Sequence, residues 1–292
     1  MEKEITKERW ANLQPISNHL PLTVASPKNR YSEFSHIELT EDEIEDALGY
    51  RRMLKARDIE DNQKKQERQD KIKKWREPWT YEQLKSAVMN RAKQLPFEFE
   101  IDKDNEKVIH LLCLYYSGDE RFNSETWTYS NGQVMNLSLK KGIGLISSKK
   151  GTGKSILTNL FQQNKYRPFL KIETKNVAAM YQKDGDKAID IHSELIHIAP
   201  NPDFYFYQDI GICFDDLGFE LPKNNWGSKS DVMADVLFAI YRKNQLIGDY
   251  SWFHFTSNLS GKDFEERYDD RIRDRMREMF NVITIHGESR RK

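Results

Sequence analysis

The stretch KGIGLISSKKGTGKSIL, residues 141–157, decides the fold of this chain. A short apolar run, residues 143–146, leads directly into Gly-Thr-Gly-Lys-Ser, and apolar residues at helical spacing follow at once. This order predicts a strand, a glycine loop and a helix. A loop of this kind turns backbone N–H groups inward at the positive end of the helix dipole, where they bind phosphate. The stretch therefore predicts a nucleotide site.

The side chains of the loop fit that site. Gly151 and Gly153 have no Cβ, so the backbone can close around a phosphate. Lys154 would reach the outer phosphates of ATP, and the Ser155 hydroxyl would hold Mg²⁺. One position departs from the pattern G-x-x-x-x-G-K-[ST], because Ser148 stands in place of the first glycine. The expected nucleotide-binding residues are Lys150, Gly151, Thr152, Gly153, Lys154, Ser155 and Ile156.

Two acidic residues follow a second apolar run, residues 210–214. Asp215 would end a strand next to the glycine loop and hold Mg²⁺ through water. Asp216 would orient the water that attacks the terminal phosphate. Glutamate is usual at this second position, and aspartate is one methylene shorter, so we expect slow hydrolysis.

Two further segments complete the expected catalytic set. The run Trp-Phe-His-Phe-Thr-Ser ends in Asn258, which would place an amide near the terminal phosphate, between the loop strand and the acidic strand. The segment from Arg267 to Arg277 carries five arginines. Such a segment is either a solvated helix face or the source of an arginine that reaches the ATP of a neighbouring subunit. A guanidinium suits that role because it is always charged and forked.

The remaining pattern predicts an α/β fold. After Pro96, apolar strand-like runs at 143–146, 168–172, 210–214, 252–256 and 282–285 are separated by helical stretches, which predicts a parallel sheet with both faces covered. The helical stretches are 104–116, 175–181, 188–197, 231–245 and 264–279, and residues 117–133 are expected to be a loop.

The N-terminal part differs in composition. Residues 1–40 contain three prolines and predict an irregular arm. Thr40 precedes three acidic residues and predicts the start of a helix over residues 41–75, whose second half has no apolar face. That helix is either a strut or a partner-binding helix. A second helix is expected from 81 to 95, so we place a helical N-terminal region at 1–95 and the α/β domain at 96–292.

Composition limits the alternatives. The chain has 292 residues, 32% of them charged, and a formal net charge of zero, so a nucleic-acid site would have to be a local patch. Cys113 and Cys213 lie in apolar runs and are expected to be buried thiols. The N-terminus lacks an apolar signal core, and no apolar run is long enough to span a bilayer. We expect a cytoplasmic protein.

From about residue 100 onward the chain resembles AAA+ ATPases of the DnaC/DnaI helicase-loader group, with the IstB transposition ATPases as relatives. The motifs that carry the resemblance are GTGKS, FDDLG, FTSN, DDRIRDRM and the tail GESRR. The resemblance implies a three-layer P-loop sandwich without a substantial C-terminal lid. It also implies that Arg275 is the arginine finger, with Arg271 second, and that Asn258 is the sensor.

The resemblance implies an ATPase that loads a hexameric replicative helicase, binds single-stranded DNA and self-associates into a ring or spiral. Residues 1–95 would then bind the helicase, by position alone. Two alternatives stay open: an IstB-like regulator of a transposase, and a nucleotide-bound scaffold that scarcely hydrolyses ATP. A basic, aromatic groove for DNA would need residues such as Lys165, Tyr166, Arg167, Lys171, Lys175, Tyr181 and Lys183, which could equally be ordinary surface residues.

Overall fold

The computed structural model describes residues 34–198, 208–220, 223–225 and 228–290. The chain divides into two compact units, residues 1–67 and 68–292. Residues 1–33 of the expected N-terminal arm lie outside the described ranges. Each unit is described by itself.

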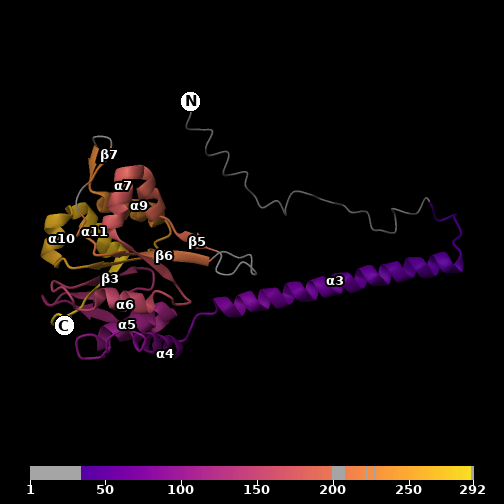
Figure 1. Cartoon of the computed structure of the whole chain (residues 1–292), viewed down its shortest axis with the longest axis horizontal. Helices are drawn as coiled ribbons and strands as arrows, with labels where there is room; N and C mark the ends of the chain where they lie inside the picture. The colour runs from indigo at the N-terminus through magenta and orange to yellow at the C-terminus, as the bar shows by residue number, and fades with distance from the viewer. Residues whose placement is uncertain (1–33, 199–207, 221–222, 226–227, 291–292) are drawn as a thin grey trace. The chain divides into compact units, whose positions relative to one another are not determined.

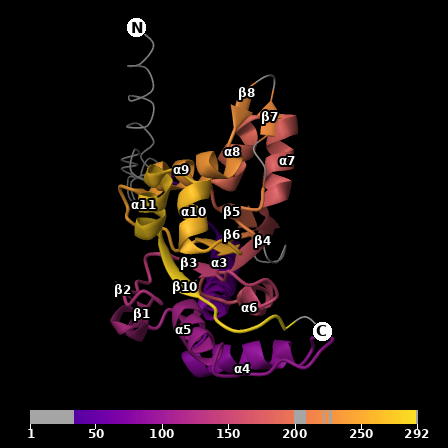
Figure 2. The same ribbon diagram turned by 90° about the vertical axis from the view of Figure 1, so that its left-hand side faces the viewer.

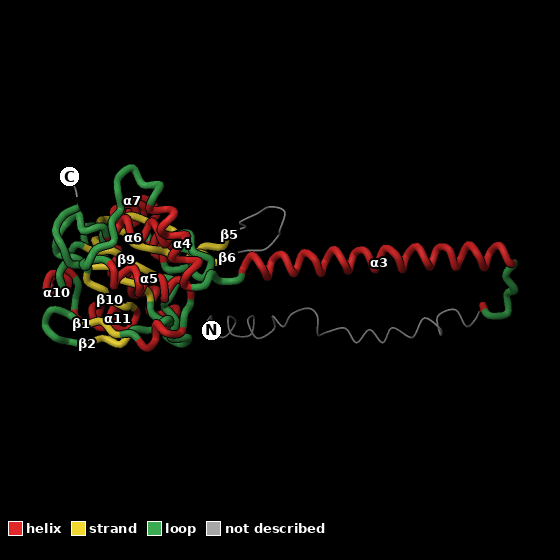
Figure 3. The backbone as a smooth tube through the Cα atoms, turned by 90° about the horizontal axis from the view of Figure 1, so that it is seen from below, coloured by secondary structure: helices red, strands yellow, loops and turns green. Residues whose placement is uncertain are grey.

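The long helix α3 (Glu41–Arg76) begins where the sequence predicts. Glu43 donates its backbone N–H to the Thr40 hydroxyl at 3.3 Å, and Thr40 donates its own N–H to the Glu43 carboxylate at 2.9 Å. This reciprocal cap satisfies two donors that the first turn would otherwise leave open. Every α3 side chain whose burial is described is exposed except Leu54, which is half-buried. The predicted helix over residues 41–75 is confirmed and extends to Arg76 (Figure 3).

The second unit is built on a parallel sheet whose strand order is β10-β3-β9-β6-β4. The strands are β3 (Gly142–Ile146), β4 (Phe169–Glu173), β6 (Gln208–Asp215), β9 (Phe253–Ser257) and β10 (Phe280–Thr284). The expected place of β9, between the loop strand and the acidic strand, is confirmed. Strand β9 therefore separates the acidic strand β6 from the glycine-loop strand β3.

Helices cover both faces of this sheet (Figures 1 and 2). One buried cluster joins the sheet to α4 (Tyr81–Ala92), α5 (Glu106–Ser117) and α6 (Lys154–Phe161). A second cluster joins it to α7 (Thr174–Asp184), α8 (Asp186–His192), α9 (Val232–Asn244), α10 (Gly261–Arg267) and α11 (Asp270–Met279). The chain therefore has the three-layer α/β architecture of a P-loop protein. Both cysteines are buried, as expected.

Helix α4 packs with the second unit. Its residues Leu84, Val88 and Ala92 are at most 3% exposed and belong to the same cluster as α5 and α6. By its packing, α4 belongs to the second unit, so the structural boundary lies earlier in the chain than the expected one near residue 96. The functional division into residues 1–95 and 96–292 stays a prediction.

Several elements differ from the prediction. The expected helix 264–279 is two helices, because Asp269 accepts the backbone N–H of Ile272 at 2.8 Å and so begins α11 with a new cap. The expected loop 117–133 contains a 3₁₀-helix (Glu120–Ser124) and strand β1 (Thr126–Thr128), which forms a hairpin with β2 (Val134–Asn136).

The expected helix over 188–197 ends early. Helix α8 ends at His192, and β5 (Ile196–Ile198) pairs antiparallel with the start of β6. A short hairpin, β7 (Lys223–Asn225) and β8 (Ser228–Ser230), precedes α9. The described residues after β10, residues 285–290, form no helix. Within the described ranges, no helix combines the length and apolar character that a membrane crossing requires.

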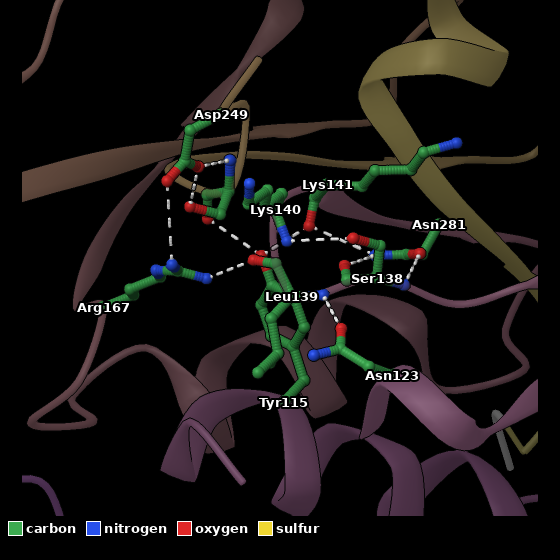
Figure 4. A network of polar contacts seen from close by, with 10 residues as sticks. Tyr115, Asn123, Ser138, Leu139, Lys140, Lys141, Arg167, Asp249 and Asn281 are labelled. Carbon is green, nitrogen blue, oxygen red and sulfur yellow. Dashed lines mark hydrogen bonds and ion pairs between the residues drawn. The ribbon is translucent and has the colours of Figure 1, made fainter. Parts of the chain in front are cut away.

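A polar network fixes the segment that enters the glycine-loop strand (Figure 4). The fully buried Asn281 side chain accepts the backbone N–H of Ser138 at 2.9 Å and donates to the Ser138 carbonyl at 2.8 Å. The Tyr115 hydroxyl lies 2.7 Å from the carbonyl oxygen of Lys141 and 2.9 Å from that of Ser251. The buried Arg167 guanidinium donates to the Leu139 carbonyl. These contacts hold the start of β3 against α5, β9 and β10.

Replacing Asn281 with alanine should destabilise the fold. The change leaves buried backbone groups at residue 138 without their partners, and each such group costs about 1–3 kcal/mol. We expect the free energy of unfolding, measured with urea, to fall by about 2–4 kcal/mol. Asn131→Ala is the matched control, because Asn131 is exposed in a turn. An equal loss for both variants would show that the network does not contribute as described.

Candidate functional site

The glycine loop has the backbone that a phosphate site requires. Gly151 and Gly153 have φ angles of 82° and 99°, in the region that favours glycine over residues with a Cβ. Helix α6 starts at Lys154, directly after Gly153, and no side chain caps its N-terminus. The positive end of the helix dipole is therefore open to an anion.

One hydroxyl in the loop supports a ligand at this point. The side-chain oxygen of Thr152 is buried, and within the described part of the chain it contacts no hydrogen-bond partner. Buried polar groups are nearly always hydrogen-bonded, so an orphaned one requires an explanation. A phosphate oxygen held by the loop would accept this hydrogen bond.

The loop forms one wall of a cleft of about 940 Å³. The cleft is large enough for a nucleotide. All seven residues expected to bind the nucleotide line it, together with two of the expected catalytic residues. The lining residues are Lys150–Leu157, Asp216, Asn258, Phe97–Glu100, Asn105, Phe219 and Arg290.

The two expected metal ligands meet at the base of the loop. The Ser155 hydroxyl donates to Asp215 Oδ1 at 3.0 Å, and the Thr256 hydroxyl donates to the same oxygen at 2.6 Å. A carboxylate and a hydroxyl are hard oxygen ligands of the kind that Mg²⁺ prefers, usually with phosphates and water completing its shell. Among the described residues, no group of three or more His, Cys, Asp or Glu side chains could hold a metal.

A chain of hydrogen bonds joins the expected catalytic residues. Lys154 donates to Asn258 Oδ1 at 2.7 Å, and Asn258 Nδ2 donates to Asp216 Oδ1 at 2.9 Å. Asp216 has a φ of 58°, which is uncommon for a residue with a side chain. Its backbone is held there by the Thr256 hydroxyl, which accepts its N–H at 3.0 Å, and by the Thr174 hydroxyl, which donates to its carbonyl at 3.0 Å.

Arg271 and Arg275 do not line this cleft. Both lie on α11, where the Arg275 guanidinium donates to the Arg271 carbonyl at 2.9 Å. The same guanidinium lies 4.7 Å from the ring centre of Phe238 and 5.2 Å from that of Tyr241, both on α9. Two aromatic rings of its own chain therefore hold the expected finger.

The structure adds cleft residues that the sequence reasoning missed. Phe97, Phe99 and Phe219 supply aromatic surface next to the loop. Arg290 belongs to the tail GESRR, whose sequence indicates no role in the cleft. Its backbone N–H donates to the Gly151 carbonyl at 2.9 Å, and its guanidinium pairs with Asp102 at 2.8 Å. The tail therefore crosses the glycine loop.

Three of the DNA candidates are wrong. Arg167 is buried beneath β3 in the polar network, and Tyr181 is only 5% exposed. Lys171 points toward the end of β6, where its ammonium lies 3.2 Å from Asp215 Oδ2. Of the remaining candidates, Lys175 and Lys183 are exposed and Lys165 and Tyr166 are half-buried.

Comparison with known proteins gives similarities to solved structures alone. No protein-family model and no curated protein matches the sequence. A protein from Streptococcus pyogenes serotype M3 described as a primosome component is 17% identical, over 65% of this chain and 84% of its own, with a TM-score of 0.41. The DnaC helicase loader is 12% identical, over 64% and 93%, with a TM-score of 0.41. AMPPCP-bound DnaA from Aquifex aeolicus is 12% identical, over 66% and 50%, also at 0.41.

Proposed function

We propose that this chain is an ATP-dependent loader of a replicative helicase. It binds ATP with Mg²⁺, a hexameric helicase and single-stranded DNA, self-associates, and changes state when ATP is hydrolysed. The observation that carries the nucleotide part is the 3.0 Å contact between Ser155 and Asp215 at the base of a glycine loop whose Thr152 hydroxyl lacks a partner among the described residues.

Five residues of the site have a role in the proposed hydrolysis. Lys154 binds the outer phosphates, and Ser155 and Asp215 hold Mg²⁺, which neutralises phosphate charge when bound. Asp216 orients the attacking water, and Asn258 directs its amide at the terminal phosphate. Because Lys154 and Asp216 both contact Asn258, ATP binding has to rearrange this chain of hydrogen bonds.

The role proposed for Arg275, supported by Arg271, is to reach the ATP of a neighbouring subunit and to neutralise the charge that develops on the transferred phosphate. Both arginines lie outside the cleft of their own chain, as a group acting in trans would. For that role, Arg275 has to leave Phe238 and Tyr241. Arg275 is half-buried, and a cation–π contact is worth about 0.5–1 kcal/mol when exposed and about 2 kcal/mol when desolvated, which an ion pair with phosphate can replace.

A scaffold that scarcely hydrolyses ATP remains the second candidate. The observation that favours it is the Asp216 side chain, which is shorter than glutamate and is bound to Asn258 at 2.9 Å. A base held in this way is less available to a water molecule. Steady-state hydrolysis by the unmodified chain, with and without single-stranded DNA, separates the scaffold from the loader.

The proposed helicase-binding surface is on α3. Ile44 and Leu48 are 45% and 50% exposed, and their spacing of four residues places them on one face of the helix. The proposal therefore assigns this face to the helicase and residues 96–292 to ATP.

Lys154→Ala should weaken ATP binding. The variant loses a charge-assisted contact with the outer phosphates, worth about 1.5–3 kcal/mol, so we expect a loss of affinity of about ten- to hundredfold by calorimetry. Lys149→Ala is the matched control, since Lys149 is exposed, pairs with Glu288 and does not line the cleft. Unchanged affinity in Lys154→Ala would refute the nucleotide site.

Arg275→Ala should lower the ATPase rate by about 10³-fold if the arginine acts in trans. Arg277→Ala, an exposed arginine of the same helix, is the control and should keep the rate. Mixing Arg275→Ala with Lys154→Ala should restore part of the activity, because one variant supplies an intact ATP site and the other an intact finger. Absence of that restoration, with folded variants, would contradict action in trans.

Substitution of the apolar face of α3 should abolish helicase capture. The full chain, used as bait in an extract of its source cells, should retain the replicative helicase, identified by mass spectrometry. The double variant Ile44→Glu, Leu48→Glu should lose it. Met53→Glu is the control, because Met53 is 41% exposed and lies on the opposite face. Recovery of a transposase in place of a helicase would instead favour the transposition regulator.

A further inference from the structure

A lysine ammonium contacts the carboxylate that is expected to hold the metal. Lys171 Nζ lies 3.2 Å from Asp215 Oδ2, and the two side chains are 21% and 9% exposed. The register explains the contact. Lys171 of β4 is opposite Cys213 of β6, so Asp215 is its diagonal neighbour on the same face, within reach of a long side chain.

Both oxygens of the carboxylate are engaged. Oδ1 accepts hydrogen bonds from Ser155 and Thr256, and Oδ2 pairs with Lys171. A buried carboxylate is costly unless it is paired and hydrogen-bonded. Lys171 thus gives the nucleotide-free site a neutral ion pair.

A divalent cation meets this pair when it approaches Ser155 and Asp215. The ammonium repels it at short range, in a partly buried place where screening by water is weak. The carboxylate in contact with Ser155 is already neutralised by Lys171, so the charge balance at this point opposes the metal. A triphosphate brings several negative charges and reverses that balance.

Building on the proposed ATP site, we propose that Lys171 makes metal binding conditional on the triphosphate. Without nucleotide, its ammonium neutralises the negative charge of Asp215 and excludes a divalent ion. With nucleotide, the phosphates compensate the extra positive charge and the metal binds together with them. Lys171 is accordingly a positioning residue for Asp215 rather than a general surface lysine.

Lys175 provides a matched comparison. It lies four residues further on, at the start of α7, and its ammonium pairs with Glu173, with 64% of the side chain exposed. The hydrogen bond from Lys175 to Glu173 raises the pKa of Lys175. Removing this charge changes the net charge of the chain equally but leaves Asp215 and its partners in place.

The test measures Mn²⁺ binding to the nucleotide-free full chain from the electron paramagnetic resonance signal of free Mn²⁺. Mn²⁺ prefers the same oxygen ligands as Mg²⁺. The wild type and Lys175→Gln should bind it weakly. Lys171→Gln, which keeps a hydrogen-bond donor near Asp215 but no charge, should bind it at least about tenfold more tightly. Adding Asp215→Asn to Lys171→Gln should remove the gain.

Thermal unfolding of each variant, with and without Mn²⁺, supplies a second reading and confirms that the variants fold. Mn²⁺ should raise the melting temperature of Lys171→Gln more than that of the wild type. Equal or weaker Mn²⁺ binding by folded Lys171→Gln would overturn the proposal, and so would an equal gain in Lys175→Gln. The Mn²⁺ measurements contain no nucleotide, so they test the role of Lys171 separately from the proposed ATP site. A failure of the ATP site itself would appear as unchanged ATP affinity in Lys154→Ala.

Discussion

The Asp215 carboxylate joins three strands of the sheet and helix α6 at one buried point. It ends β6 and is held by Ser155 after β3, by Thr256 of β9 and by Lys171 of β4. A carboxylate that is only 7% exposed has to be compensated by such partners, because an unpaired buried charge costs far more than the pairing returns. The strand order β3-β9-β6-β4 is what brings these partners together. The glycine loop and the acidic strand therefore depend on each other.

The parts of this site that the sequence predicts are local patterns. The spacing of Gly151, Gly153, Lys154 and Ser155 sets the backbone of one turn, and an apolar run before Asp215 makes a strand end. Both can be recognised without knowing the fold. The place of Asn258 between them follows once a parallel sheet is assumed, and the structure agrees.

The parts that the sequence did not predict depend on register and on distant packing. Nothing in the local sequence marks Lys171 and Thr256 as partners of Asp215. Only the register of β4, β6 and β9 shows that both face Asp215. Arg290 reaches Gly151 only because the tail crosses the loop. Helix α4 looked like part of the N-terminal region because Leu95-Pro96 breaks the chain after it. Its apolar stripe nevertheless completes the core with α5 and α6.

The polar groups of the cleft are largely satisfied by one another. Lys154 and Asp216 share Asn258, and Ser155 and Lys171 share Asp215. A bound triphosphate has to replace these contacts, so part of its binding energy is used to rearrange the site. The cations that line the cleft, Lys150, Lys154 and Arg290, come from the same chain, whereas Arg275 is held by Phe238 and Tyr241 outside the cleft. If the proposed reaction needs a further positive charge as the phosphate leaves, a second copy of the chain has to supply it, which ties hydrolysis to assembly.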